Sequence, residues 1–139
     1  MSFLGDAVEV LGNEITVTGG TIEEGVYGGL AQLGGNASGN TVTISGGTIN
    51  KYVYGGSADS GTASNNTVNI YGGTFKSDTR LYGGFSDDSS GNTLNFYTKG
   101  ITVDKLGYFQ NLSFYVPEDT TAGETILTVT STADVSGAS

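Results

Sequence analysis

The chain of 139 residues contains 24 glycines and one proline, and its 14 acidic and 5 basic residues give a formal net charge of −9. This length fits one domain, and the negative charge disfavours binding to nucleic acid or to an anionic membrane. Because Cys and His are absent, disulfides, thiolate nucleophiles, zinc thiolate sites and Ser-His triads are excluded. No apolar run approaches the roughly 18 residues of a membrane helix. We therefore expect no direct membrane insertion.

Residues 1–11 come before an internal repeat and are short of a whole unit of it. Val8 and Val10 alternate with polar neighbours, as expected for a strand. We predict that this segment is the N-terminal edge of the fold, formed by the end of a preceding turn.

Residues 12–103 contain one pattern several times. It begins at Asn13, Asn40, Asn66 and, in a degenerate copy, at Asn92, with spacings of 27, 26 and 26 residues. Each of the first three copies reads Asn, a short alternating run, Gly-Gly, and later an aliphatic residue followed by Tyr-Gly-Gly. A fixed period of this length is typical of solenoids.

Within each copy, apolar residues alternate with polar ones at a period of two, which places the apolar set on one face of a strand. One interior column of stacked side chains is predicted to contain Ile15, Val42, Val68 and Leu94. A Gly-Gly bend follows this strand, then a short second strand, and then a third before the second Gly-Gly pair; the bends use glycines because glycine tolerates positive φ. The pattern predicts an all-β parallel β-helix, right-handed, with about four turns of 26 to 28 residues and three short strands per turn. The leucine-rich, hexapeptide and calcium-binding nonapeptide repeat patterns are absent.

Three polar segments of variable length separate the copies, and we interpret them as loops on one edge of the solenoid: 30–39, 57–65 and 85–91. The repeat weakens from about Asp104. Residues 104–139 are therefore predicted to form an irregular β cap and tail that blocks edge pairing.

The asparagine that opens each copy is predicted to form a structural ladder along the solenoid, in which each side-chain amide bonds backbone in its own and adjacent turns. Its members are Asn13, Asn40, Asn66 and Asn92.

The unit N-x-V-x-I-x-G-G-x-I followed by V-Y-G-G, with F-Q-N-L-S-F-Y-V-P and T-I-L-T-V-T after it, resembles repeats in the passenger regions of large bacterial autotransporter adhesins. The resemblance spans about residues 12 to 130. It implies a right-handed β-helix displayed on the bacterial cell surface or secreted, as a fragment of a longer exported chain. Members of this class include adhesins, self-associating proteins and proteases, so the resemblance leaves the activity open.

Two outward-facing sets are candidate binding surfaces. The first is a face of hydroxyls, amides and rings that could bind a glycan or another flat surface, with a solvated β-face as the alternative: Thr16, Thr43, Asn69, Asn95, Tyr71 and Tyr97, with Thr18 and Ser45 beside them. Its two asparagines argue against a threonine array of the ice-binding kind. The second is an aromatic track suited to sugar rings, with stacking beside the glycine bends as the alternative: Tyr27, Tyr54 and Tyr82.

Other sites receive less support from the sequence. Asp59, Asp87 and Asp88 lie in polar segments where oxygen ligands could gather around Ca²⁺, but no EF-hand spacing is present. We expect no metal and no cofactor. Parallel β-helices also include polysaccharide lyases and hydrolases, which use basic residues or paired carboxylic acids. The repeat aligns charged residues as Glu23 with Asn50 and Lys76, and Glu24 with Lys51 and Ser77, while Arg80 lies nearby. We interpret these mixed-sign stacks as ion pairs between turns.

The sequence thus favours a non-catalytic stalk with an adhesive surface. Expected partners are a host glycan, a host protein or a second copy of the chain. The alternative is an enzyme that degrades polysaccharides.

Overall fold

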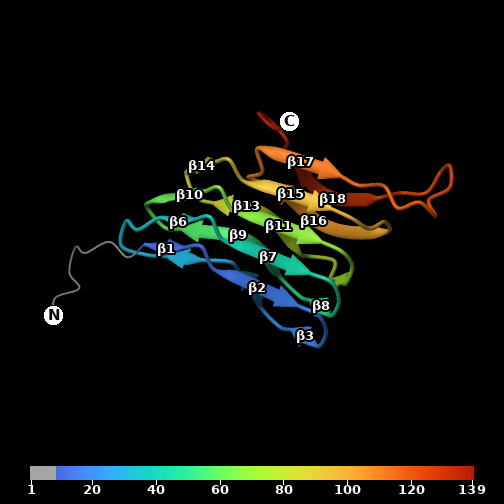
Figure 1. The fold of residues 1–139 in the computed structure, drawn as a ribbon, viewed down its shortest axis with the longest axis horizontal. Coiled ribbons are helices and arrows are strands. Elements are labelled where there is room, and N and C mark those ends of the chain that lie inside the picture. The colour runs from blue at the N-terminus through green and yellow to red at the C-terminus, as the bar shows by residue number, and fades with distance from the viewer. Residues whose placement is uncertain (1–8) are drawn as a thin grey trace.

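The computed structural model describes residues 9–139 and contains strands and turns, with no helix among the described residues. The strands stack into a parallel β-solenoid of about five turns (Figure 1), which confirms the predicted fold class. The described chain accordingly offers no helix with the length and apolar character needed to cross a membrane.

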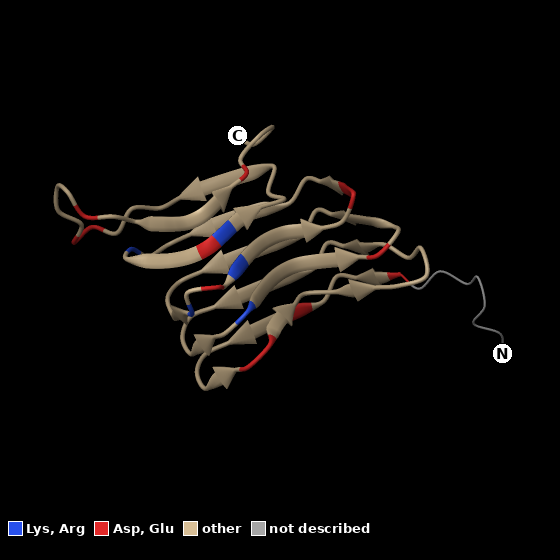
Figure 2. Ribbon diagram, turned by 180° about the vertical axis from the view of Figure 1, so that it is seen from behind, with Lys and Arg blue, Asp and Glu red and all other residues tan. Residues whose placement is uncertain are grey.

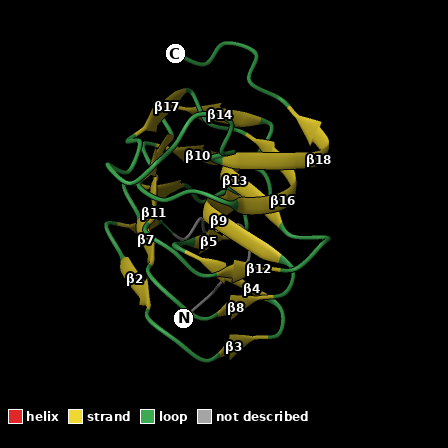
Figure 3. Ribbon diagram, turned by 90° about the vertical axis from the view of Figure 1, so that its right-hand side faces the viewer, coloured by secondary structure: helices red, strands yellow, loops and turns green. Residues whose placement is uncertain are grey.

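Equivalent strands of successive turns pair in parallel and form four sheets along the solenoid, which Figure 3 shows from the side. Each is named after its first strand. The β1 sheet contains β1 (Val10–Leu11), β6 (Ala37–Ser38), β10 (Thr62–Ser64) and β14 (Asp88–Ser90). The β2 sheet contains β2 (Glu14–Val17), β7 (Thr41–Ile44), β11 (Thr67–Ile70), β15 (Thr93–Phe96) and β17 (Asn111–Phe114). The β3 sheet contains β3 (Thr21–Ile22), β8 (Thr48–Ile49) and β12 (Thr74–Phe75). The β4 sheet contains β4 (Gly25–Tyr27), β9 (Tyr52–Ala58), β13 (Arg80–Phe85), β16 (Ile101–Gly107) and β18 (Leu127–Ala133), with β5 (Leu30–Ala31) also paired to β9.

The predicted inner column is confirmed by the register of the β2 sheet. Ile15 pairs with Val42, Val42 with Val68, and Val68 with Leu94. Val42, Val68 and Leu94 are fully buried, whereas Ile15 in the first turn remains 37% exposed because it lies at the end of the stack. The columns from the β2, β3 and β4 sheets meet in one apolar core.

The β1 sheet is the main departure from the expected three strands per turn. It arises within the segments interpreted as loops, where β6, β10 and β14 pair in parallel. Ala37 of β6 and Ala63 of β10 meet Ala31 of β5 and Ala58 of β9, and these four buried alanines form a second core with Val10 packed against it. Because alanine and serine give weak hydrophobic alternation, the sequence pattern concealed these strands.

The chain also forms a fifth turn. β17 continues the β2 sheet in register with β15, so that Leu112 stacks on Leu94 and Phe114 on Phe96. The expected boundary at residue 104 falls inside β16. Residues 9–11 lie beside the second turn through β1, and Val8 lies outside the described residues.

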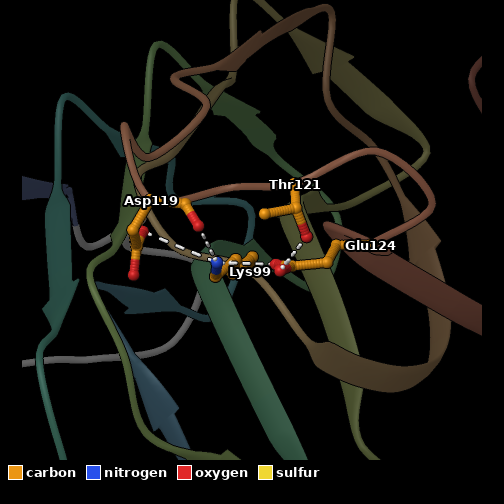
Figure 4. A network of polar contacts seen from close by, with 4 residues as sticks. All are labelled: Lys99, Asp119, Thr121 and Glu124. Atoms are coloured by element: carbon orange, nitrogen blue, oxygen red, sulfur yellow. Dashed lines mark hydrogen bonds and ion pairs between the residues drawn. The ribbon is translucent and has the colours of Figure 1, made fainter.

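The segment between β17 and β18 forms a loop that projects from the stack near the C-terminal end (Figure 1). Lys99 holds it from the turn between β15 and β16: its Nζ lies 2.6 Å from Oε2 of Glu124 and 3.5 Å from Oδ1 of Asp119 (Figure 4). The Thr121 hydroxyl donates a 2.7 Å hydrogen bond to Glu124. Acidic groups of the loop are thereby tied to a single cation.

Candidate binding face

The predicted Asn ladder runs through the buried corner between the β1 and β2 sheets. Oδ1 of Asn66 accepts hydrogen bonds from the backbone N–H and Nδ2 of Asn40, both at 3.0 Å. Asn92 does the same for Asn66 at 3.0 and 3.1 Å, and Asn40 for Asn13 at 3.0 Å. Each Nδ2 of Asn40, Asn66 and Asn92 also donates to a backbone carbonyl of the β1 sheet. The ladder therefore fixes one turn on the next.

Gln110 ends this ladder. Its Oε1 accepts from the backbone N–H of Asn92 at 2.9 Å and from Nδ2 at 3.2 Å, so it takes the position of a fifth asparagine. The separation from Asn92 to Gln110 is 18 residues instead of 26, because the β1 sheet ends at β14 and this turn lacks a strand there. A search for a regular Asn spacing misses Gln110 for both reasons.

The two Gly-Gly pairs of each repeat have different roles. In the first pair the second glycine has positive φ, as predicted: +77° at Gly20, +84° at Gly47 and +103° at Gly73. The second pair, which follows the tyrosine, does not have positive φ. Its glycines leave room for the ladder instead. A Cβ on Gly29 would lie 2.5 Å from Nδ2 of Asn40, and one on Gly56 would lie 2.6 Å from Nδ2 of Asn66.

The outer surface of the β2 sheet repeats from turn to turn because its strands pair in register. Thr16, Thr43, Asn69 and Asn95 lie in one outward column, and Ser113 of the fifth turn extends it. Nδ2 of Asn95 donates to Oδ1 of Asn69 at 2.9 Å, and Nδ2 of Asn69 to Oγ1 of Thr43 at 3.4 Å. The amides are thus partly engaged with one another, whereas Thr16 in the first turn is exposed.

A stack of tyrosines lies beside this column, just after the strands end. The rings of Tyr71 and Tyr97 are 4.4 Å apart at an interplanar angle of 2°, and those of Tyr97 and Tyr115 are 4.5 Å apart at 9°. Tyr71 and Tyr115 are each 51% exposed. Desolvation between its neighbours, followed by hydrogen bonding with Tyr71, raises the pKa of Tyr97. Our sequence reading missed Tyr115, although Phe114-Tyr115 repeats the Phe96-Tyr97 pair.

This stacking decides what the surface can offer a ligand. Because each ring covers the face of the next, the inner faces are unavailable, and the stack presents ring edges and phenolic hydroxyls. Together with the Thr and Asn column, it forms a surface of hydrogen-bonding groups that repeats from turn to turn. We name the six predicted residues, extended by Ser113 and Tyr115, the candidate face.

The second predicted surface, the aromatic track, lies on the β4 sheet and is in register: Tyr27 pairs with Tyr54, and Tyr54 with Tyr82. Tyr54 is only 3% exposed. It packs against Tyr82 with ring centroids 5.2 Å apart and against Tyr27 at 5.3 Å. Burial raises the pKa of Tyr54 to about 12, although the neighbouring Arg80 guanidinium acts in the opposite sense. The track is therefore an aromatic cluster with a covered centre.

Two of the basic residues considered for catalysis lie where the chain enters the β4 sheet, since Lys51 directly precedes β9 and Arg80 begins β13. Figure 2 shows Lys, Arg, Asp and Glu positions interspersed along the ribbon. Lys51 Nζ lies 3.1 Å from Oε2 of Glu24, and Asn50 donates a 2.7 Å hydrogen bond to Glu23. The Arg80 guanidinium lies 5.9 Å from the centroid of the Tyr52 ring. Lys51 and Arg80 therefore have partners within the fold.

The expected alignment of Lys51 with Ser77 in the next turn is wrong. Arg80 pairs with Tyr52, so Thr79 and not Ser77 follows Lys51 in register. The third turn has two more residues between its β3-sheet and β4-sheet strands than the second turn. Buried Thr79 accommodates this insertion by donating a hydrogen bond of 3.2 Å to the carbonyl of Ile49.

Across residues 9–139, no three acidic side chains gather as metal ligands would. Asp59 and Asp87 line one cleft, and Asp88 begins β14.

Comparison of the chain with protein-family models, curated proteins and solved structures gives no significant match.

Proposed function

We propose that this chain is a non-catalytic segment of a bacterial surface or secreted adhesin, of the autotransporter passenger type that its repeats resemble. In this role the solenoid is a stalk, and the candidate face is the adhesive surface. The partner is a host glycan or protein, or a second copy of the chain.

The observation that carries this proposal is the candidate face itself. Its Tyr71, Tyr97 and Tyr115 rings are held in a rigid stack, with exposed edges, beside hydroxyl and amide groups on regular β-strands. Groups fixed in this way lose little conformational entropy when they bind, which favours recognition of an extended, hydroxyl-rich partner.

The stalk role is supported by the way the turns are joined. Apolar columns and the Asn ladder connect each turn to its neighbours, so stability is distributed along the axis as in other repeat proteins. The ion-paired Lys51 and the aromatic-packed Arg80 are better suited to holding turns together than to acting as catalytic bases.

The proposal is tested with the full chain on an array of host and microbial glycans, with host matrix proteins and the chain itself immobilised alongside. In parallel, pectin and alginate are incubated with the protein and their length is measured. We expect binding to a subset of the array and no depolymerisation. Depolymerisation that is lost in a Lys76→Ala or Arg80→Ala variant would overturn the proposal, as would failure to bind any immobilised partner.

A further inference from the structure

A cleft of about 270 Å³ opens where strands β9 and β13 of the β4 sheet end, and it shares no residue with the candidate face. Its apolar wall is formed by Leu30, Phe85 and Tyr108, and Asp59 and Asp87 also line it. It is smaller than the roughly 300–1,000 Å³ typical of pockets for drug-sized molecules. The space suits one side chain rather than an oligosaccharide.

The register of three turns creates this cleft. Leu30 pairs with Ser57, and Ser57 with Phe85, so the three occupy one column. Leu30 is 49% and Phe85 40% exposed, whereas the small Ser57 between them is buried. A serine between two large apolar side chains leaves a notch in the column.

The aromatic wall is held in place from behind. The Phe85 ring lies 5.3 Å from Tyr54 and 5.5 Å from Tyr108, the latter at an interplanar angle of 90°. Gly107 occupies the position above Tyr82 where earlier turns have tyrosine. Tyr108, with φ of +60°, packs its ring at 4.9 Å from Tyr82 instead. The wall is thus fixed before any ligand arrives.

The charge of the cleft defines its ligand. All five Lys and Arg residues belong to the described part of the chain, and none of them lines the cleft. Within residues 9–139, neither Asp59 nor Asp87 takes part in an ion pair. Two carboxylates beside aromatic rings attract a cation through both charge and the ring quadrupole. Within residues 9–139, the cleft therefore has no cation of its own.

We propose that this cleft binds the guanidinium group of an arginine side chain presented by a partner protein. A guanidinium is planar, stacks on aromatic faces and bonds carboxylates through its fork of N–H donors. A lysine ammonium, being compact and strongly hydrated, gains less from the same wall.

The test is an NMR titration of the full, ¹⁵N-labelled chain with Nα-acetyl-arginine methylamide and with its neutral citrulline counterpart. We expect a dissociation constant of about 1–10 mM for the arginine compound, with the largest shifts at the amides of Phe85, Asp87 and Tyr108. The citrulline compound should bind at least about tenfold more weakly. Equal shifts from the two compounds, shifts centred elsewhere, or no response to about 50 mM arginine compound would overturn the proposal.

Two variants locate the effect. Asp59→Asn/Asp87→Asn should weaken arginine binding at least about fivefold, and Phe85→Ser, which introduces the residue found at the same column position in the preceding turn, at least about threefold. The control Glu14→Gln/Glu118→Gln removes the same total charge from other surfaces. It should change the dissociation constant less than about twofold at 0.15 M salt. Equal weakening by the control pair, or no weakening by the cleft variants, would show that general charge attraction is responsible and would contradict the assignment.

Discussion

Asn66 and Asn92 lie one turn apart, and Oδ1 of Asn92 accepts hydrogen bonds from both the backbone N–H and the Nδ2 of Asn66, at 3.0 and 3.1 Å. Both residues are fully buried. A single side chain therefore satisfies polar groups of two turns, which the apolar columns cannot do.

Replacing Asn66 with Ala should destabilise the whole described solenoid. The change leaves the Asn40 backbone N–H and the Ala37 carbonyl without their ladder partner, at a cost of roughly 2–5 kcal/mol in the free energy of unfolding. Chemical denaturation measures this loss. Asn69→Thr is the control, because it introduces the residue that Thr43 already supplies in the same column, and it should change stability by less than about 1 kcal/mol. Equal losses would mean that the ladder has no special role.

Gly56→Ala tests whether the second glycine pair makes room for the ladder. The added Cβ would lie 2.6 Å from Nδ2 of Asn66 and would displace that amide. We expect a loss of about 1–3 kcal/mol, as for other overpacked sites. Gly19→Ala, whose Cβ would meet nothing within 4 Å, should be neutral or stabilise by up to about 1 kcal/mol. Thermal melts of the two variants, compared at equal concentration, check the difference, and a tolerated Gly56→Ala would contradict this role.

The sequence predicted the parts of the fold that depend on strong alternation and on a constant period. The column Ile15, Val42, Val68 and Leu94 follows from both. The β1 sheet was missed because its alanine and serine side chains give weak hydrophobic alternation. The fifth turn was missed because Gln110 replaces asparagine at a shortened spacing.

The repeat pattern predicted most of the candidate face but not the cleft. The repeat places Tyr71 and Tyr97 one above the other, but the stacking of their ring faces depends on side-chain orientation, which the repeat does not indicate. The cleft joins Leu30, Phe85 and Tyr108. The first two lie in segments that the sequence suggested were loops, and the third depends on a positive φ that no pattern indicates.

The loop between β17 and β18 should loosen at low pH. Glu124 accepts hydrogen bonds from Lys99 and Thr121, and these hold its pKa below the ordinary value of 4.5, with the larger effect from Lys99. The contact with Glu124 in turn raises the pKa of Lys99 above 10.5. Since the folded-state pKa of Glu124 is lowered, its contribution is complete above pH 4.5 and is lost as pH falls through the lowered value. The Lys99 contribution is complete below pH 10.5 and is lost above it.

Heteronuclear NOE values for residues 118–124 measure this change. They should stay constant from pH 5 to 8 and fall below pH 4.5, whereas a Glu124→Gln variant should show low values throughout. A loop equally rigid at all pH values in both proteins would contradict the tether.

Tyr54 should be among the last tyrosines to ionise. Burial raises its pKa from 10.0 to about 12, so the stability that it contributes is complete below pH 10 and is lost as the pH rises through about 12. Absorbance titration of the eight tyrosines should show a late step that disappears in Tyr54→Phe. Loss of amplitude near pH 10 in that variant, with the late step retained, would mean that Tyr54 is accessible to solvent and would contradict the prediction.

The central claim is that the candidate face is the adhesive surface. The most direct measurement compares beads coated with wild type, with Tyr71→Ser/Tyr97→Ser or with Tyr27→Ser, a tyrosine outside both the candidate face and the cleft, on the immobilised partner that binds wild type best. Ser45 occupies the position equivalent to Tyr71 in the preceding turn, so serine is compatible with this column and the double variant should keep its fold. Circular dichroism verifies this. We predict that the double variant loses at least about 90% of bead adhesion and that Tyr27→Ser retains most of it. Undiminished adhesion of a folded double variant, or equal loss in both variants, would contradict the claim.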